Sequence, residues 1–151
     1  TLHDQRGQAV ALPDGRVWAV SFFYGSCETV CPRIVHNLGE VAQAFPGAAG
    51  NRVAFAAVTF DPDRDTPDRL TEIGHQHGLK AANAYVLRGD AATTATAVKA
   101  FGFDFKPDGA GGYRHVNLLA VMDGQGRILK HFYGLDPNLE QVTAVIKEAL
   151  K

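Results

Sequence analysis

The chain has few cysteines, which can form disulfides, and few of the large apolar residues methionine and tryptophan. It contains two cysteines, one methionine and one tryptophan among 151 residues. A chain of this length can bury most of its apolar surface without a metal or a disulfide framework. We therefore expect one domain spanning residues 1–151, and we expect the two cysteines to serve a function rather than stability alone.

An excess of charge of either sign is also missing. Fifteen basic and sixteen acidic residues give a net charge of −1, and no basic run is present, so no nucleic-acid partner is expected. The longest apolar runs, VWAVSFFY and NLLAVM, are far shorter than the roughly 18 residues of a membrane span, so the domain is expected to be soluble. The chain begins at Thr1 and not at methionine, which is compatible with a removed signal peptide or membrane anchor.

Strands and helices are predicted to alternate along the chain. Apolar runs predict strands over 16–24, 52–60 and 84–89, a strand or hairpin over 7–12, and a hairpin formed by 115–123 and 127–134. Helical spacing and capping residues predict helices over 32–45, from Thr66 towards Gly78, over 91–101 after Asp90, and from Asp136 onward. The glycine-rich segment 106–114 is predicted to be a loop. This order predicts an α/β domain with a central mixed β-sheet flanked by helices.

The two cysteines lie close together in SFFYGSCETVCPRIVHNL, residues 21–38. Three residues separate Cys27 from Cys31, and the pair falls where the first buried strand gives way to a helix. Because the amino end of a helix stabilises anions, at least one thiol is expected to be available as thiolate. Such a pair can form a disulfide that switches, form a disulfide that only staples, or bind a soft metal. Two inert buried cysteines are the remaining alternative, and the tight spacing at a helix start disfavours it.

Three segments occur in order along nearly the whole chain: FFYGSCETVCP, TFDPDRDTP and HVNLLAVMDGQGRI. Together they resemble the signature segments of the Sco/SenC family. The resemblance implies a thioredoxin-like fold and a role in delivering copper to cytochrome c oxidase. It also implies that Cys27, Cys31 and His115 hold the metal as Cu(I) or Cu(II). Proteins of this family usually carry an amino-terminal membrane anchor.

His115 stands at a position that matters in thioredoxin-like proteins. Reductases of that fold place a cis-proline at the start of the strand facing their cysteines, whereas here the strand entry reads GYRHVNLL. Two thiolates and one imidazole form a soft set suited to copper, and the thiolates alone would hold Cu(I). A structural zinc site would require a fourth protein ligand. The alternative for His115 is a hydrogen-bonded histidine at a strand start. The other histidines are expected at the surface, with His36 as a weak auxiliary donor: His3, His36, His75, His77 and His131.

The acidic segment DPDRDTPDRLTE has carboxylates at calcium-loop positions: Asp61, Asp63, Asp65 and Glu72. Calcium is disfavoured because Thr66 stands where the sharp turn of such a loop needs glycine, and a strand precedes the segment where a helix should. We expect instead a strand-to-helix loop near the cysteines that orients the site or meets a partner.

Two functions remain open. The first is a copper-binding metallochaperone, which performs no catalytic turnover. Its expected partners are the copper-accepting subunit of cytochrome c oxidase and other copper carriers or thiol reductants. The second is a thiol–disulfide oxidoreductase with Cys27 and Cys31 as its redox-active pair; His115 in place of the proline favours the first. A monomer is expected. Its expected location is the periplasm or the mitochondrial intermembrane space, because a cysteine pair that cycles through a disulfide belongs in an oxidising compartment.

Overall fold

The computed structural model describes residues 2–25, 31–45, 52–79, 83–110, 113–115, 117–134 and 136–151; for Cys31, Pro32, Arg114 and His115 it describes the backbone only. The strands are β1 (Leu2–His3), β2 (Ala9–Val10), β3 (Val17–Phe23), β4 (Val53–Thr59), β5 (Ala84–Leu87), β6 (Phe105–Pro107), β7 (Tyr113–His115), β8 (Leu118–Met122) and β9 (Ile128–Tyr133). The helices are α1 (Cys31–Gln43), α2 (Pro67–Gln76), α3 (Ala91–Ala100) and α4 (Leu139–Ala149).

The main sheet has five strands in the order β5-β4-β3-β8-β9. Strands β3, β4 and β5 run parallel, whereas β8 and β9 run antiparallel to their neighbours, so the predicted mixed sheet is confirmed. Every residue of β3, β4 and β8 is buried. Strands buried along their whole length are typical of a sheet that is covered on both faces.

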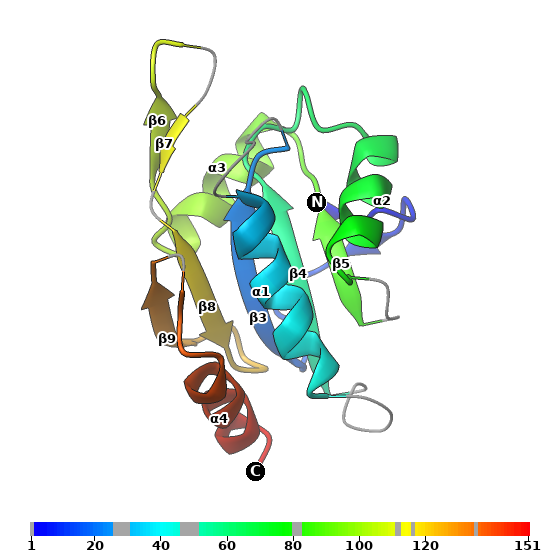
Figure 1. Ribbon diagram of the computed structural model, residues 1–151. Coiled ribbons are helices and arrows are strands. Elements are labelled where there is room, and N and C mark those ends of the chain that lie inside the picture. The colour runs from blue at the N-terminus through cyan, green and yellow to red at the C-terminus, as the bar shows by residue number, and fades with distance from the viewer. Residues whose placement is uncertain are drawn as a thin grey trace.

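Helices cover the two faces of this sheet. Helix α1 lies across β3 and β4 (Figure 1), and the ring of Phe45, just past its end, is 6.0 Å from the ring of Phe55 in β4. Helix α4 contacts α1, β3, β8 and β9 and buries Val142 and Ile146. Side chains alternate between the two faces of a strand, and Phe22 of β3 points to the face of the sheet away from α1. There its ring lies 5.7 Å from that of Phe101, just past the end of α3.

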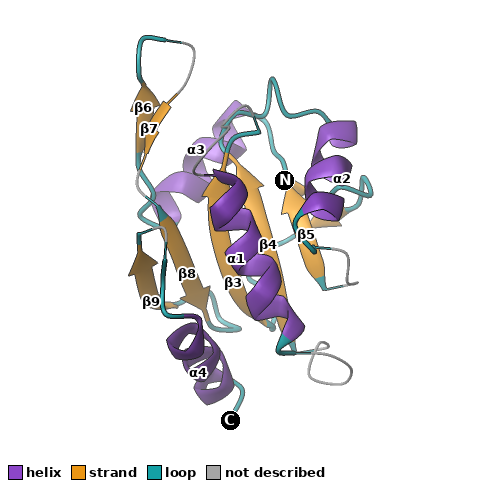
Figure 2. Cartoon of the chain, in the orientation of Figure 1, coloured by secondary structure: helices purple, strands orange, loops and turns teal. Residues whose placement is uncertain are grey.

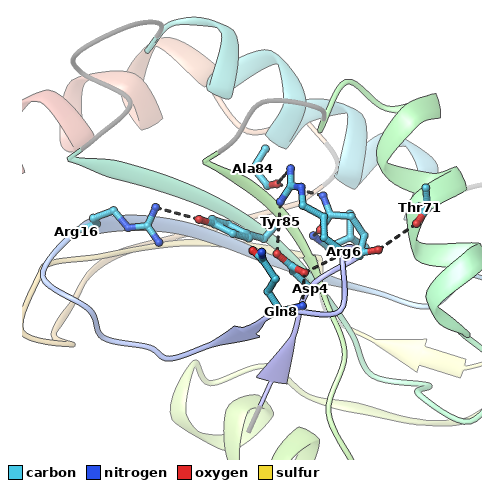
Figure 3. Close-up of polar contacts among 9 residues, drawn as sticks. Asp4, Arg6, Gln8, Arg16, Thr71, Ala84 and Tyr85 are labelled. Atoms are coloured by element: carbon cyan, nitrogen blue, oxygen red, sulfur yellow. Dashed lines mark hydrogen bonds and ion pairs between the residues drawn. The ribbon is translucent and has the colours of Figure 1, made fainter.

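The amino-terminal segment covers the outer edge of β5. The buried carboxylate of Asp4 accepts hydrogen bonds from the backbone N–H groups of Arg6 (2.8 Å) and Gln8 (2.9 Å), and this closes a tight turn (Figure 3). From the turn, the side chains of Arg6 and Gln5 both donate to the carbonyl oxygen of Ala84, at 3.4 and 3.2 Å. An open sheet edge is a template for pairing with another chain, so this turn protects β5.

Helix starts agree with the sequence except at the last helix. Asp90 caps α3 as predicted, because its carboxylate accepts the N–H of Thr93 at 2.7 Å. Helix α4 begins later than predicted, because Asn138 and not Asp136 provides the cap, accepting the N–H of Gln141 at 3.2 Å. No helix within the described ranges is both long and apolar enough to cross a membrane.

The prediction of a loop over residues 106–114 is wrong in part. Strands β6 and β7 form a separate antiparallel hairpin, with Phe105 opposite His115 and Pro107 opposite Tyr113. Figure 2 shows this hairpin extending beyond the end of the main sheet. Each strand has only three residues and adjoins a glycine-rich turn, so the sequence carries no strand periodicity there.

Replacing Leu38 of α1 by alanine is expected to lower the free energy of unfolding by about 2–5 kcal/mol, because its side chain is fully buried between the helix and the sheet. Leu129→Ala in β9 is the matched control; its side chain is 45 % exposed, and the expected loss is below about 1 kcal/mol. Urea denaturation of both variants measures the two losses. Equal losses would contradict this packing.

Candidate metal site

The topology of the main sheet brings the predicted ligand segments to the same end of the sheet, where β3 ends and β8 begins. Strand β8 runs antiparallel to β3, with Ser21 opposite Leu119, so the carboxyl end of β3 lies beside the amino end of β8. Cys27 follows the end of β3 by four positions, and His115 precedes the start of β8 by three. Segments far apart in the sequence therefore leave the sheet at neighbouring points.

The cysteine segment is described only at its ends. Cys31 is the first residue of α1, as the predicted strand-to-helix junction requires. Cys27 lies outside the described residues, as do the other residues of 26–30, and for Cys31 only the backbone is described. His115 is the last residue of β7, again with only its backbone described. The ligand set of two thiolates and one imidazole therefore remains a prediction.

A buried carboxylate holds the chain where it leaves β3. The side chain of Asp65 accepts the backbone N–H of Gly25 at 3.0 and 3.2 Å, and the hydroxyl of Thr59 also donates to it. The guanidinium of Arg69 donates to the carbonyl oxygen of Gly25 at 2.5 Å and lies 3.5 Å from Asp65. We call this arrangement of Asp65 and Arg69 around Gly25 the Gly25 clamp.

The clamp explains why residue 25 is a glycine. A Cβ atom at this position would lie 2.3 Å from Oδ1 of Asp65 and 2.6 Å from Nε of Arg69. Both charged residues belong to the acidic segment, so this segment contacts the chain at Gly25, two positions before Cys27. Its expected role in orienting the site stays a prediction. The same contacts give Asp65 a structural role, because its carboxylate is engaged by Gly25, Thr59 and Arg69.

A second set of contacts joins β3 to the hairpin. The backbone N–H of Tyr113 donates to the hydroxyl oxygen of Tyr24 at 3.4 Å, and the hydroxyl of Tyr113 donates to Oδ1 of Asp61 at the same distance. The two tyrosine rings lie edge to face with their centroids 5.0 Å apart. Tyr24 directly follows β3 and Asp61 follows β4 by two positions, so the hairpin is held against the ends of both strands.

Burial makes the two groups at this contact harder to ionise. It raises the pKa of Asp61, with the nearby Asp65 acting in the same direction and Arg64, whose Nε lies 3.5 Å from Oδ2, opposing them. The pKa of Tyr113 is raised as well, by burial and by the neighbouring charge of Asp61. A neutral hydroxyl that donates to a carboxylate is therefore the stable form at neutral pH.

His3, His36 and His75 are exposed as predicted, whereas His77 and His131 are partly buried. The ring of exposed His36 pairs with Glu40, with Nε2 and Oε1 3.0 Å apart. His77 is half-buried, and its pKa is lowered by burial and by the charge of His36. His131 shares a hydrogen bond of 3.0 Å with the carbonyl oxygen of Phe101. Within the described part of the chain, no group of three or more acidic, histidine or cysteine residues is arranged to hold a metal ion.

The family model described as SCO1/SenC matches residues 1–151. The chain belongs to the SCO1/SenC family. A curated SCO1 protein homolog of Bacillus subtilis (strain 168) is 26% identical to this chain over 141 residues, or 90% of this chain and 72% of that protein.

Solved Sco structures share the fold. Bradyrhizobium japonicum ScoI with copper bound is 28% identical, with a TM-score of 0.79 over 98% of this chain and 95% of that chain. Yeast Sco1 with copper bound is 20% identical, with a TM-score of 0.76 over 97% of this chain and 85% of that chain. The predicted thioredoxin-like architecture is therefore confirmed.

Four residues next to the site were missed by reasoning from the sequence: Tyr24, Asp65, Arg69 and Tyr113. Their partners are distant in the sequence and meet them only in the folded sheet. The only sequence feature that pointed to them was TFDPDRDTP. It indicated a functional loop but did not show which of its carboxylates is buried.

Asp65→Ala is expected to lower the free energy of unfolding by about 3 kcal/mol, because the N–H of Gly25 and the hydroxyl of Thr59 lose their acceptor and each orphaned buried donor costs about 1–3 kcal/mol. Asp63→Ala, in the same loop but exposed, is the matched control and should cost below about 0.5 kcal/mol. Chemical denaturation distinguishes them. A negligible loss for Asp65→Ala would show that the Gly25 clamp is not formed.

The shifted carboxylates predict opposite pH dependences. Asp61 has its pKa raised above 3.8, so its contribution to stability should fall as the pH rises from 3.8 through its folded pKa. Asp123 has its pKa lowered, chiefly by the backbone N–H of Arg127, so its contribution should be complete above 3.8 and fall as the pH drops through its folded pKa. Unfolding free energies of wild type, Asp61→Asn and Asp123→Asn across about pH 3–7 measure both. Differences from wild type that move in the same direction with pH would refute this assignment.

Proposed function

We propose that this protein is a copper carrier that acts in the assembly of cytochrome c oxidase and holds its cargo through Cys27, Cys31 and His115. The observation that carries the proposal is membership of the SCO1/SenC family, together with a relative of 28% identity that was solved with copper bound. The three residues are those of this chain that match the family's ligand pattern.

The arrangement of the described residues supports this ligand set. The segment after β3 and the hairpin ending at His115 meet at one sheet edge, joined by the contact between Tyr24 and Tyr113. Cys31 begins α1, and the amino terminus of a helix favours the negative charge of a thiolate. Two soft sulfurs bind Cu(I), and an added imidazole nitrogen extends the set to one that also suits Cu(II).

The redox state of the cysteines would control loading. Metal binding requires both thiols in the deprotonated, reduced form. If Cys27 and Cys31 form a disulfide, that bond must first take up two electrons and two protons from a thiol reductant before copper can bind. Thiol reductants are therefore proposed partners, beside other copper carriers and the copper-accepting subunit of the oxidase.

The same chemistry underlies the alternative function, a thiol–disulfide oxidoreductase. One thiolate would attack a substrate disulfide and the other would resolve the mixed disulfide. His115 where a reductase carries proline favours the carrier. We place the protein outside the cytoplasm, in the periplasm or its mitochondrial equivalent, as a monomer held near the membrane by a preceding anchor; this fits a pair that cycles between thiol and disulfide.

Reduced wild-type protein is expected to bind one equivalent of copper, with intense thiolate charge-transfer absorption in the Cu(II) form. His115→Ala should weaken or abolish the Cu(II) spectrum and keep appreciable Cu(I) binding, because Cu(I) is satisfied by two thiolates. Cys27→Ser and Cys31→Ser should each abolish both. Anaerobic titration followed by absorption measures these outcomes.

His36→Ala is the matched control for the histidine variant, because His36 is exposed on α1 and pairs with Glu40. It should leave both copper forms as in wild type. The carrier proposal fails if reduced wild-type protein takes up no stoichiometric copper yet reduces a disulfide substrate at enzyme-like rates.

A further inference from the structure

The hairpin of β6 and β7 cannot hold its own position. It has three residues in each strand and forms a separate two-stranded sheet. Isolated two-stranded hairpins are marginally stable in water, so side-chain contacts must fix this one to the main sheet. Since His115 is the last residue of β7, the same contacts decide where the backbone of His115 lies.

Tyr113 lies at the centre of these contacts. Its ring meets three other aromatic rings edge to face, with centroid distances of 5.0 Å to Tyr24, 5.3 Å to Phe60 and 5.6 Å to Phe105. Phe60, which is buried, packs in turn on Phe105 at 4.5 Å and on Tyr24 at 5.2 Å. Tyr113 therefore attaches β7 to residues that follow β3 and β4 as well as to its own hairpin.

Tyr113 also forms two hydrogen bonds beside its aromatic contacts. The N–H of Tyr113 donates to the hydroxyl of Tyr24, and its own hydroxyl donates to Asp61, whose side chain is almost completely buried. Aromatic packing alone tolerates sliding, whereas these two hydrogen bonds, each 3.4 Å long, favour one position of β7 relative to Tyr24 and Asp61. Tyr24 precedes Cys27 by three positions, and Tyr113 precedes His115 by two.

We propose that Tyr113 is a positioning residue that holds the strand of His115 beside the cysteine segment and thereby supports Cu(II) more than Cu(I). This inference rests on the proposed copper function. A three-ligand Cu(II) site needs the imidazole at a set distance from the thiolates, whereas Cu(I) is satisfied by the thiolates alone. Loosening β7 should therefore weaken Cu(II) binding selectively.

The test compares Tyr113→Ala, Tyr113→Phe and Tyr24→Phe with wild type. Tyr133→Ala and Tyr133→Phe are the matched controls, because Tyr133 is 62 % exposed at the end of β9. Tyr113→Phe keeps the ring and loses only the hydrogen bond to Asp61, so it stays informative even if Tyr113→Ala folds poorly. Backbone amide hydrogen exchange of Phe105, Lys106 and residues 113–115 in the metal-free protein gives a readout independent of copper.

For Tyr113→Ala we expect faster exchange in the hairpin and a loss of Cu(II) affinity of about ten- to a hundredfold, the usual range for a group that orients a ligand, with Cu(I) affinity changed by less than about threefold. Tyr113→Phe and Tyr24→Phe should show smaller shifts in the same direction. The Tyr133 variants should match wild type in both measurements.

Unchanged hairpin exchange in Tyr113→Ala, or equal losses of Cu(I) and Cu(II) affinity, would overturn the positioning role. Failure of the copper function looks different: wild type would bind no stoichiometric copper, or His115→Ala would leave Cu(II) binding intact. If His115→Ala loses Cu(II) and Tyr113→Ala does not, copper binding stands and the inference about Tyr113 falls.

Discussion

The pairing of β3 on both sides is the constraint on which the rest of the molecule depends. Its parallel partner β4 ends at the same edge as β3, whereas its antiparallel partner β8 begins there. Three chain segments therefore converge: the one leading to Cys27, the acidic loop after β4, and the hairpin that ends at His115. The segments that carry the cysteine pair and His115 therefore leave the sheet at neighbouring points, although His115 follows Cys31 by 84 positions in the sequence.

The sheet brings these segments to the same end of its strands but does not fix their positions relative to one another. Contacts from the acidic segment after β4 add that restraint. Asp65 and Arg69 grip the peptide of Gly25, and Asp61 receives the hydroxyl of Tyr113. The acidic segment thus contacts both Gly25, after β3, and Tyr113 in the hairpin. A buried carboxylate is costly unless its hydrogen bonds are satisfied, so these contacts also explain why Asp65 can be fully buried.

The parts of this fold that depend on local chemistry could be predicted from the sequence. Strands that are buried on both faces appear in the sequence as continuous apolar runs. Asp90, a good N-cap residue, indicates the start of α3. The hairpin of β6 and β7 could not be predicted, because its strands are short and are held by aromatic rings from distant segments. In the site, the cysteine pair and His115 follow from motifs and from family resemblance. Tyr24, Asp65 and Tyr113 became visible only through tertiary contacts.

The most direct test of the central claim is X-ray absorption spectroscopy at the copper edge, on Cu(II)-loaded wild type and on His115→Ala loaded under the same conditions. Wild type should show two sulfur scatterers and the multiple-scattering signature of an imidazole. The variant should bind less copper under these conditions, and the copper that it still binds should show both sulfurs and no imidazole. Coordination by nitrogen and oxygen alone in wild type, or an imidazole signature that persists unchanged in His115→Ala, would contradict copper ligation by Cys27, Cys31 and His115.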